Sequence, residues 1–222
     1  MNYFAHALPF LDDPYFAAGT GVPDWLTVVD RQVRVRLRNA ERLAGDPDRR
    51  TASIAAGVAQ HIRDDAHFHA TRPFAELSWD LTARARDALG GDEPGFRPAF
   101  LGHLLVEVLL DASLIAEDPQ RLEAYYRLFE SVDTGVVQEA VNRMAVRRTG
   151  RLAVMISEFC RLRILSDYLD DGKLMGWINQ VMRRVKQPQL PEDFCQILPE
   201  ARRQIDARKS ELLEGIPTLP RK

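Results

Sequence analysis

The chain has 222 residues, of which 45% are hydrophobic and 28% are charged, and its formal net charge at pH 7 is −2. This length and composition allow a full hydrophobic core, and the nearly neutral charge gives no overall bias toward nucleic acid or a membrane surface. The two cysteines, Cys160 and Cys195, form neither a CxxC pair nor a secreted disulfide framework, so we expect both to be packing residues.

The start of the chain, Met1–His6, lacks the basic region followed by an apolar run that marks a signal peptide. No stretch reaches the roughly 20 uninterrupted apolar residues that span a bilayer. We therefore predict a cytoplasmic protein with no membrane partner.

Helical periodicity dominates the chain and predicts an all-α bundle of about eight to ten helices in one domain, residues 1–215, with a loose tail at 216–222. Asp13 and Pro14 predict the start of a short helix over 15–18, and the glycines of 19–23 predict a loop. Asp24 would then cap the next helix. Residues 33–38 alternate like a strand, but no partner strand is visible, so a helix is predicted there too. The remaining expected helices are 51–69, 73–89, 97–116, 119–132, 135–148, 151–169, 173–185 and 192–213.

Charge is distributed unevenly along the chain. Residues 1–120 contain 12 basic and 18 acidic side chains, whereas residues 121–222 contain 18 and 14. All five histidines lie in the acidic part, so we look for a cation within residues 1–118. The basic part, 119–215, either helps to hold an anionic substrate or simply has solvated arginine faces.

The expected helix 51–69 contains His61 and Asp65 at positions i and i+4, where both side chains can reach one ion. His69 lies two turns beyond His61, so it can pair with Asp65 or serve a second ion. Asp64 points roughly 100° away from Asp65, by the helical rotation per residue. His67 points to another side and is expected at the surface.

A second helix contains His103, Glu107 and Asp111 at the same spacing, among side chains that are apolar nearly all the way round. Buried carboxylates are costly unless a partner compensates them, and a cation is such a partner. Imidazole and carboxylate ligands without thiolates favour Mn²⁺, Zn²⁺ or Fe²⁺, as one ion or as two. The alternative is a buried polar network without metal, or ordinary ion pairs along a helix.

Four short motifs resemble the acyl-carrier-protein phosphodiesterase family. They are the start Met1–His6, the segment from Gly19 to Asp24-Trp25, the segment from Ala56-Gly57 to Asp65, and the segment from Glu107 to Leu114. The resemblance covers about the first half of the chain. It departs from the family at Ala112, which replaces a histidine, at Ile62, which replaces an arginine, and at Glu107 and His69.

This resemblance implies an HD-like, all-helical, manganese-dependent hydrolase that removes a phosphopantetheine arm. It also implies that one metal-centred site contains His6, Asp24, His61, Asp65 and Asp111. His69 and His103 would be replacement ligands.

Each of these residues also has an ordinary structural interpretation. His6 would be a core histidine, Asp24 a helix cap, and Asp65 an ion-pair partner of Arg63 or Arg72. Glu107 and Asp111 would pair with basic residues of the second half.

We therefore expect a metal-dependent phosphohydrolase or phosphodiesterase in which a metal-activated water attacks a phosphate ester. Asp65, Glu107 and Arg63 are the expected catalytic residues, with Arg143, Arg147, Arg148 and Arg151 as other candidates to stabilise the phosphate. The substrate would be a phosphorylated small molecule or a phosphopantetheine-type group. The alternatives are a non-catalytic helical binding protein with a decayed or structural site, and a nucleic-acid binder, against which the scattered basic residues argue. The sequence leaves the oligomeric state open.

Overall fold

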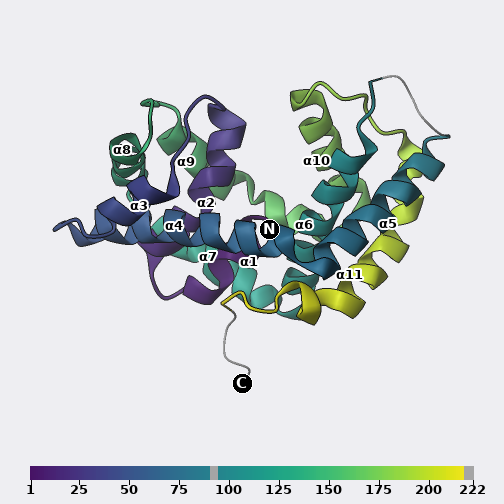
Figure 1. Cartoon of the computed structure of the whole chain (residues 1–222), viewed down its shortest axis with the longest axis horizontal. Helices are drawn as coiled ribbons and strands as arrows, with labels where there is room; N and C mark the ends of the chain where they lie inside the picture. Colours follow the sequence, from purple (N-terminus) through teal and green to yellow (C-terminus); the bar gives the residue numbers. More distant parts are fainter. Residues whose placement is uncertain (91–94, 218–222) are drawn as a thin grey trace. The chain divides into compact units, whose positions relative to one another are not determined.

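The computed structural model describes residues 1–90 and 95–217, and over these residues it contains α-helices, 3-10 helices and no β-strand (Figure 1). The predicted all-α class is therefore confirmed. The helices are α1 (Tyr3–Ala7), α2 (Pro14–Val29), α3 (Leu37–Leu43), α4 (Arg49–Ala70), α5 (Arg72–Ala88), α6 (Pro98–Glu117), α7 (Pro119–Glu130), α8 (Thr134–Met144), α9 (Leu152–Leu162), α10 (Asp171–Arg184) and α11 (Leu198–Leu212). The 3-10 helices are η1 (Leu8–Phe10), η2 (Ile164–Leu169) and η3 (Glu192–Ile197).

The chain divides into two compact units, each built from separate stretches of sequence. Unit 1 contains Met1–His67, Asp118–Ile164 and the segment that begins at Ile216, and unit 2 contains Phe68–Glu117 and Leu165–Gly215. The boundary between Glu117 and Asp118 coincides with the predicted change in composition. The other boundaries have no such marker in the sequence.

An aromatic core fills unit 1. Trp25 of α2 packs against Phe129 of α7 and Phe159 of α9, with ring centroids 5.7 and 5.5 Å apart. Tyr3 of α1 lies 4.8 Å from Phe159 and Phe4 lies 5.8 Å from Tyr125, so the short helix α1 is anchored by two buried rings. This anchoring matters because α1 also carries His6.

The loop predicted at residues 19–23 was wrong, because helix α2 occupies these positions. The helix runs without interruption through Gly19, Gly21 and Pro23, and Asp24 lies inside it, so the prediction of Asp24 as an N-cap was wrong. Gly19 allows a close helix crossing, because a Cβ there would lie 2.2 Å from the carbonyl oxygen of Ile54 in α4. Glycine is used here for its missing side chain, whereas the prediction assumed its backbone freedom.

The segment 33–38 was wrongly predicted as a helix. Helix α3 begins only at Leu37, after the extended residue Arg36, and Val35 forms an isolated antiparallel bridge with Ala145. Val33 is buried while its neighbours Arg34 and Arg36 are exposed. The period-two pattern therefore reflected a real extended segment, whose single bridge partner lies far away in the chain.

Three later helices are shorter than predicted. Helix α8 ends at Met144, whose carbonyl accepts a hydrogen bond from the Asn39 side chain at 2.8 Å. Helix α9 ends at Leu162 because Arg163 adopts the left-handed conformation, with φ at 49°, and η2 follows. The expected helix 192–213 is split into η3 and α11.

Unit 2 is built around α6, which packs against α5 and α11. Of the described residues, α6 is the one helix long and apolar enough to cross a membrane by length and composition, and 67% of its most apolar window is buried inside the protein. A mostly buried core helix meets the same criteria, so this finding is weak support for a membrane span.

Two sequence predictions fall partly beyond the described residues. Between the expected helices 73–89 and 97–116, residues 91–94 are not described, and within the tail predicted as loose, residues 218–222 are not described. The tail prediction fails at its first residue, because Ile216 is buried.

Candidate metal centre

The structure brings histidine and carboxylate side chains together in two groups that could hold a metal ion. The first contains His6, His61 and Asp65 in unit 1, and the second contains His69, His103 and Glu107 in unit 2. In each group the potential ligand atoms lie within 4.8 Å of one another. Both groups combine two imidazoles with one carboxylate.

The first group depends on the close crossing of α2 and α4. Gly57 of α4 lies against α2, where a Cβ would be 2.1 Å from the carbonyl oxygen of Phe16. One turn beyond Gly57, the Nδ1 atom of His61 lies 2.7 Å from the carbonyl oxygen of Thr20. A carbonyl can only accept, so Nδ1 of His61 donates, and the crossing of two helices fixes the orientation of this imidazole.

Thr20 contacts this group but was not indicated by the sequence. Its contribution is a backbone carbonyl, which any residue at that position would supply. The sequence signal was indirect and lay in Gly19 beside Thr20 and in Gly57, which permit the close approach of α2 and α4.

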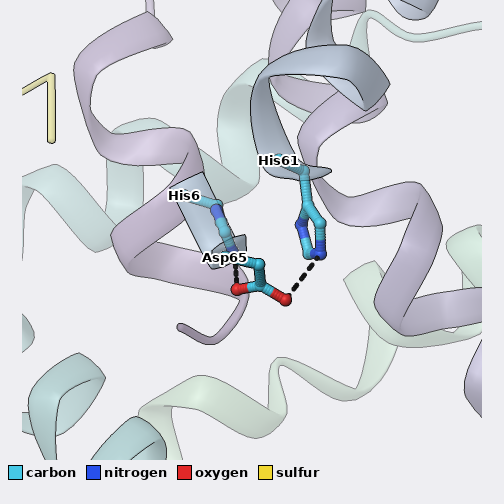
Figure 2. A group of neighbouring side chains, drawn as sticks. All are labelled: His6, His61 and Asp65. Atoms are coloured by element: carbon cyan, nitrogen blue, oxygen red, sulfur yellow. Dashed lines mark hydrogen bonds and ion pairs between the residues drawn. The ribbon is translucent and has the colours of Figure 1, made fainter. Parts of the chain in front are cut away.

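The carboxylate of Asp65 faces one nitrogen of each imidazole (Figure 2). Its Oδ1 atom is 3.1 Å from Nε2 of His6, and its Oδ2 atom is 3.4 Å from Nε2 of His61. The two rings stack with centroids 3.8 Å apart, and the residues are 1% and 3% exposed. Both Nε2 atoms therefore face one carboxylate in a buried setting.

The carboxyl group of Asp65 is ionised. Burial opposes ionisation, but hydrogen bonds from His6 and His61 and the positive amino group of Met1 outweigh it and hold the pKa of Asp65 well below its ordinary value of 3.8. The Met1 nitrogen donates to Oδ1 of Asp65 at 2.7 Å. The first group is therefore a site built around a negative charge.

Asp64 adds a second carboxylate beside His6, and this one is buried. Its Oδ2 atom lies 3.9 Å from Nδ1 of His6, and its Oδ1 atom accepts a hydrogen bond from Gln60 at 2.7 Å. Nδ1 of His6 is itself buried and has no hydrogen-bond partner among the described residues. The sequence gave no reason to choose Asp64 as a site residue, because its contact with His6 depends on tertiary packing.

The second group joins the last turn of α4 to α6. Nε2 of His69 and Nε2 of His103 lie 2.9 and 3.3 Å from Oε1 of Glu107. Burial opposes ionisation of Glu107, but hydrogen bonds from both histidines favour it, and the pKa of Glu107 lies below its ordinary value of 4.5. The predicted spacing of His103 and Glu107 is therefore realised.

The remaining predicted site residues lie elsewhere. Asp24 and Asp111 belong to neither three-residue group among the described residues, so the expected row His103–Glu107–Asp111 is shortened to its first two members. Asp111 is fully buried in α6, and Asp24 is partly buried in α2. His67 is exposed, as predicted.

Arg63 points away from the first group. It forms an exposed ion pair with Glu41 at 2.6 Å, and Arg72 pairs with Glu76, so the alternative in which either arginine neutralises Asp65 is wrong. Three of the other candidate arginines also have polar partners: Arg143 contacts Asp46, Arg147 contacts Gln32, and Arg148 contacts Glu139.

Neither cysteine is in a disulfide, and Cys160 is not a candidate nucleophile. Burial, together with the nearby charge of Glu130, raises the pKa of Cys160 to about 11, which keeps the thiol protonated at neutral pH.

Comparison with protein-family models, curated proteins and solved structures gives no match for this chain. The functional argument therefore rests on the arrangement of the side chains and on the motif resemblance.

Proposed function

We propose that this protein is a metal-dependent hydrolase of phosphate esters, with a divalent cation held by His6, His61 and Asp65. The observation that carries the proposal is the orientation of His61. Because its Nδ1 atom donates to the carbonyl of Thr20, its Nε2 atom is the one turned toward Asp65. A neutral imidazole with this hydrogen bond has its lone pair on Nε2, the arrangement that metal-ligating histidines use.

The donor set fits a catalytic ion better than a structural one. Two imidazoles and one carboxylate leave a coordination position for water, as in the three-ligand sites of metallohydrolases, whereas structural zinc sites are closed by four ligands. When bound, a divalent ion lowers the pKa of its water and polarises a phosphoryl oxygen. Asp65 supplies the negative charge for the ion, Thr20 orients His61, and Asp64 faces the second nitrogen of His6.

The choice of a phosphate ester rests on the motif resemblance to the acyl-carrier-protein phosphodiesterases. His6, His61 and Asp65 occupy positions that this resemblance implies, and they lie together in the structure. A phosphopantetheine-type group or a phosphorylated small molecule is the substrate class that follows. Arg63 is not part of the proposal, because it pairs with Glu41 at the surface. Glu107 is not part of it either, because it belongs to the second group.

One observation favours the alternative of a non-catalytic protein with a structural polar network. The amino group of Met1 already contacts Asp65 at 2.7 Å, and both histidines contact the same carboxylate. Such a network could be satisfied by protons alone. Metal content separates the two functions, because a structural network needs no ion.

The test compares metal content and hydrolysis in matched variants. Wild type, His61→Asn, Asp65→Asn and His67→Asn are purified without chelator or nickel resin, and their metal is measured by elemental analysis. The His61→Asn side chain keeps a donor for Thr20 but lacks Nε2, and His67→Asn changes an exposed histidine of the same helix. Each protein is then assayed with bis(p-nitrophenyl) phosphate and p-nitrophenyl phosphate in the presence of Mn²⁺, Zn²⁺ or Fe²⁺.

We expect wild type and His67→Asn to retain the metal and to hydrolyse the diester in a metal-dependent way. His61→Asn and Asp65→Asn should each lose one metal equivalent, and their hydrolysis should fall at least about 100-fold, since loss of a ligand should exceed the 10–100-fold effects of outer-shell changes. Unchanged metal content in both variants would overturn the proposed site. Retained metal without hydrolysis of any phosphate ester would reject the activity.

A further inference from the structure

We propose that His69, His103 and Glu107 form a second, separate zinc-binding site at the surface of unit 2. All three residues belong to this unit, His69 in the last turn of α4 and the other two on α6. None of them is used by the proposed hydrolase site. The proposal therefore stands whether or not that function is correct.

Two of the three distances between ligand atoms are close to those around a tetrahedral zinc ion. At Zn–N and Zn–O distances of about 2.0–2.1 Å, two ligands of a tetrahedral ion lie about 3.3 Å apart. Oε1 of Glu107 is 2.9 Å from Nε2 of His69 and 3.3 Å from Nε2 of His103. An ion could replace the protons of both imidazoles with small side-chain shifts.

The imidazoles are held in place by an aromatic ring of α5. The ring of Phe74 lies 4.8 Å from that of His69 and 4.9 Å from that of His103, and the two imidazole centroids are 4.7 Å apart. Gly102, the residue before His103, allows α6 to approach α5 closely, since a Cβ there would lie 2.6 Å from the carbonyl oxygen of Ser78. Three helices thus limit the freedom of the ligands before any ion binds, which reduces the entropic cost of binding.

The second group is open to solvent, which sets it apart from the first. The side chains of His69 and His103 are 31% and 42% exposed, and that of Glu107 is 17% exposed. An ion can therefore arrive from solution and keep a water ligand. Two imidazoles and one carboxylate favour Zn²⁺ over Mn²⁺, Mg²⁺ or Ca²⁺, because affinity for nitrogen ligands rises along the first-row series and the last two prefer oxygen.

The test is a Zn²⁺ titration of metal-free protein by isothermal calorimetry. Asp65→Asn serves as the background, because it disables the first group and leaves the residues of the second unchanged. His69→Gln, His103→Gln and the control His67→Gln are each made in this background. Circular dichroism melts establish that each variant is folded, and cobalt absorption between about 500 and 700 nm reports the ligand geometry in the same proteins.

We expect the Asp65→Asn protein to bind one equivalent of Zn²⁺, with a tetrahedral cobalt spectrum. His69→Gln and His103→Gln should each weaken binding at least about 100-fold, since loss of a direct ligand should exceed the 10–100-fold losses caused by outer-shell changes. His67→Gln should have no effect. Equal Zn²⁺ affinity in all these variants, or no binding by Asp65→Asn itself, would overturn this site.

The two proposals fail in different ways. If wild type binds two equivalents and Asp65→Asn also binds two, the hydrolase site is wrong and the zinc site is not affected. If His69→Gln and His103→Gln in the wild-type chain keep both equivalents, the zinc site is wrong and the hydrolase site is not affected.

Discussion

At the scale of single residues, the central feature is the buried His61, whose two ring nitrogens have different partners. One nitrogen of His61 donates to a backbone carbonyl, and the other faces the carboxylate of Asp65. The carbonyl fixes which nitrogen carries the proton in the neutral ring. A polar group this deeply buried is costly unless both of its ends are satisfied, and a proton or a metal ion on Nε2 can satisfy the second end.

Asp65 should stabilise the metal-free protein in a pH-dependent way. Its carboxylate accepts hydrogen bonds from His6 and His61, and its pKa in the folded state lies below the ordinary value of 3.8. Because the folded state holds this proton less tightly than the unfolded state, the stabilisation is fully present above pH 3.8 and is lost as the pH falls below that value. We expect Asp65→Asn to lower the free energy of unfolding by about 3 kcal/mol at pH 7.

Urea denaturation of chelator-treated protein at pH 7 and pH 3 measures this effect. The difference between wild type and Asp65→Asn should shrink by about 1 kcal/mol at pH 3, since linkage allows at most about 1.4 kcal/mol per pH unit for one proton. The control Asp80→Asn, an exposed residue of α5, should change stability by less than about 0.5 kcal/mol. A difference that grows toward acid pH would contradict the assignment of Asp65 as the ionised partner.

At the scale of secondary-structure elements, the first site depends on how closely α2 and α4 approach. Gly57 and Gly19 lie at the crossing, and a side chain on either would overlap a backbone carbonyl of the other helix. Thr20 follows Gly19 by one residue, and His61 follows Gly57 by one turn. The hydrogen bond that orients His61 is therefore a consequence of the crossing.

We expect Gly57→Ala to destabilise the protein and to displace His61. The added Cβ would lie 2.1 Å from the carbonyl oxygen of Phe16, so the two helices must separate. Overpacking of this kind costs about 1–3 kcal/mol, and loss of the Thr20 contact should lower metal affinity as well. Thermal melts and metal titration measure the two effects.

Gly176 in α10 provides the matched control. It is exposed, and a Cβ there would meet no atom of the described residues within 4 Å. Alanine is the better helix former by about 1 kcal/mol, so Gly176→Ala should leave stability unchanged or raise it. If Gly57→Ala behaved like Gly176→Ala, the close crossing would have no energetic role.

The elements show which parts of the fold are encoded locally. Helices α4 and α6 could be predicted within two residues at each end because their apolar periodicity is long. Helix α2 could not, because Gly19 and Pro23 are read locally as helix breakers, and only the neighbouring helix shows why glycine is required. Val35 was misassigned for a related reason, since its bridge partner Ala145 is distant in sequence.

The same distinction holds for the candidate site. The pairs His61–Asp65 and His103–Glu107 follow from helical spacing, because the partners are one turn apart. His6 entered through the motif resemblance, and its contact with Asp65 requires α1 to fold onto unit 1 through Tyr3 and Phe4. Such contacts follow from tertiary packing and cannot be obtained from periodicity.

At the scale of the whole molecule, many of the described basic side chains in the second half of the sequence are paired with acidic ones. Arginine and lysine side chains in both units pair with acidic neighbours. These pairs are mostly exposed, so each contributes little to stability. Examples within single units are Arg148 with Glu139, Arg161 with Glu158, Arg202 with Asp171, Arg208 with Glu211 and Lys209 with Glu117. Their more important effect is to cancel positive charge locally.

This local neutralisation predicts weak and nearly salt-independent binding to DNA. A protein that neutralises several phosphates releases counterions, and its affinity for duplex DNA then falls steeply with salt, with a slope of about −0.9 per phosphate contact. Because many of the described arginines already have carboxylate partners and the net charge is −2, we expect a dissociation constant above about 10⁻⁴ M for generic duplex DNA at physiological salt. Fluorescence anisotropy with a labelled duplex from 50 to 200 mM NaCl, roughly the range in which phosphate contacts are most evident, measures both quantities. Binding in the micromolar range with a slope steeper than about −3 would show that the arginines exchange their carboxylate partners for phosphates, and it would replace the hydrolase with a nucleic-acid-binding function.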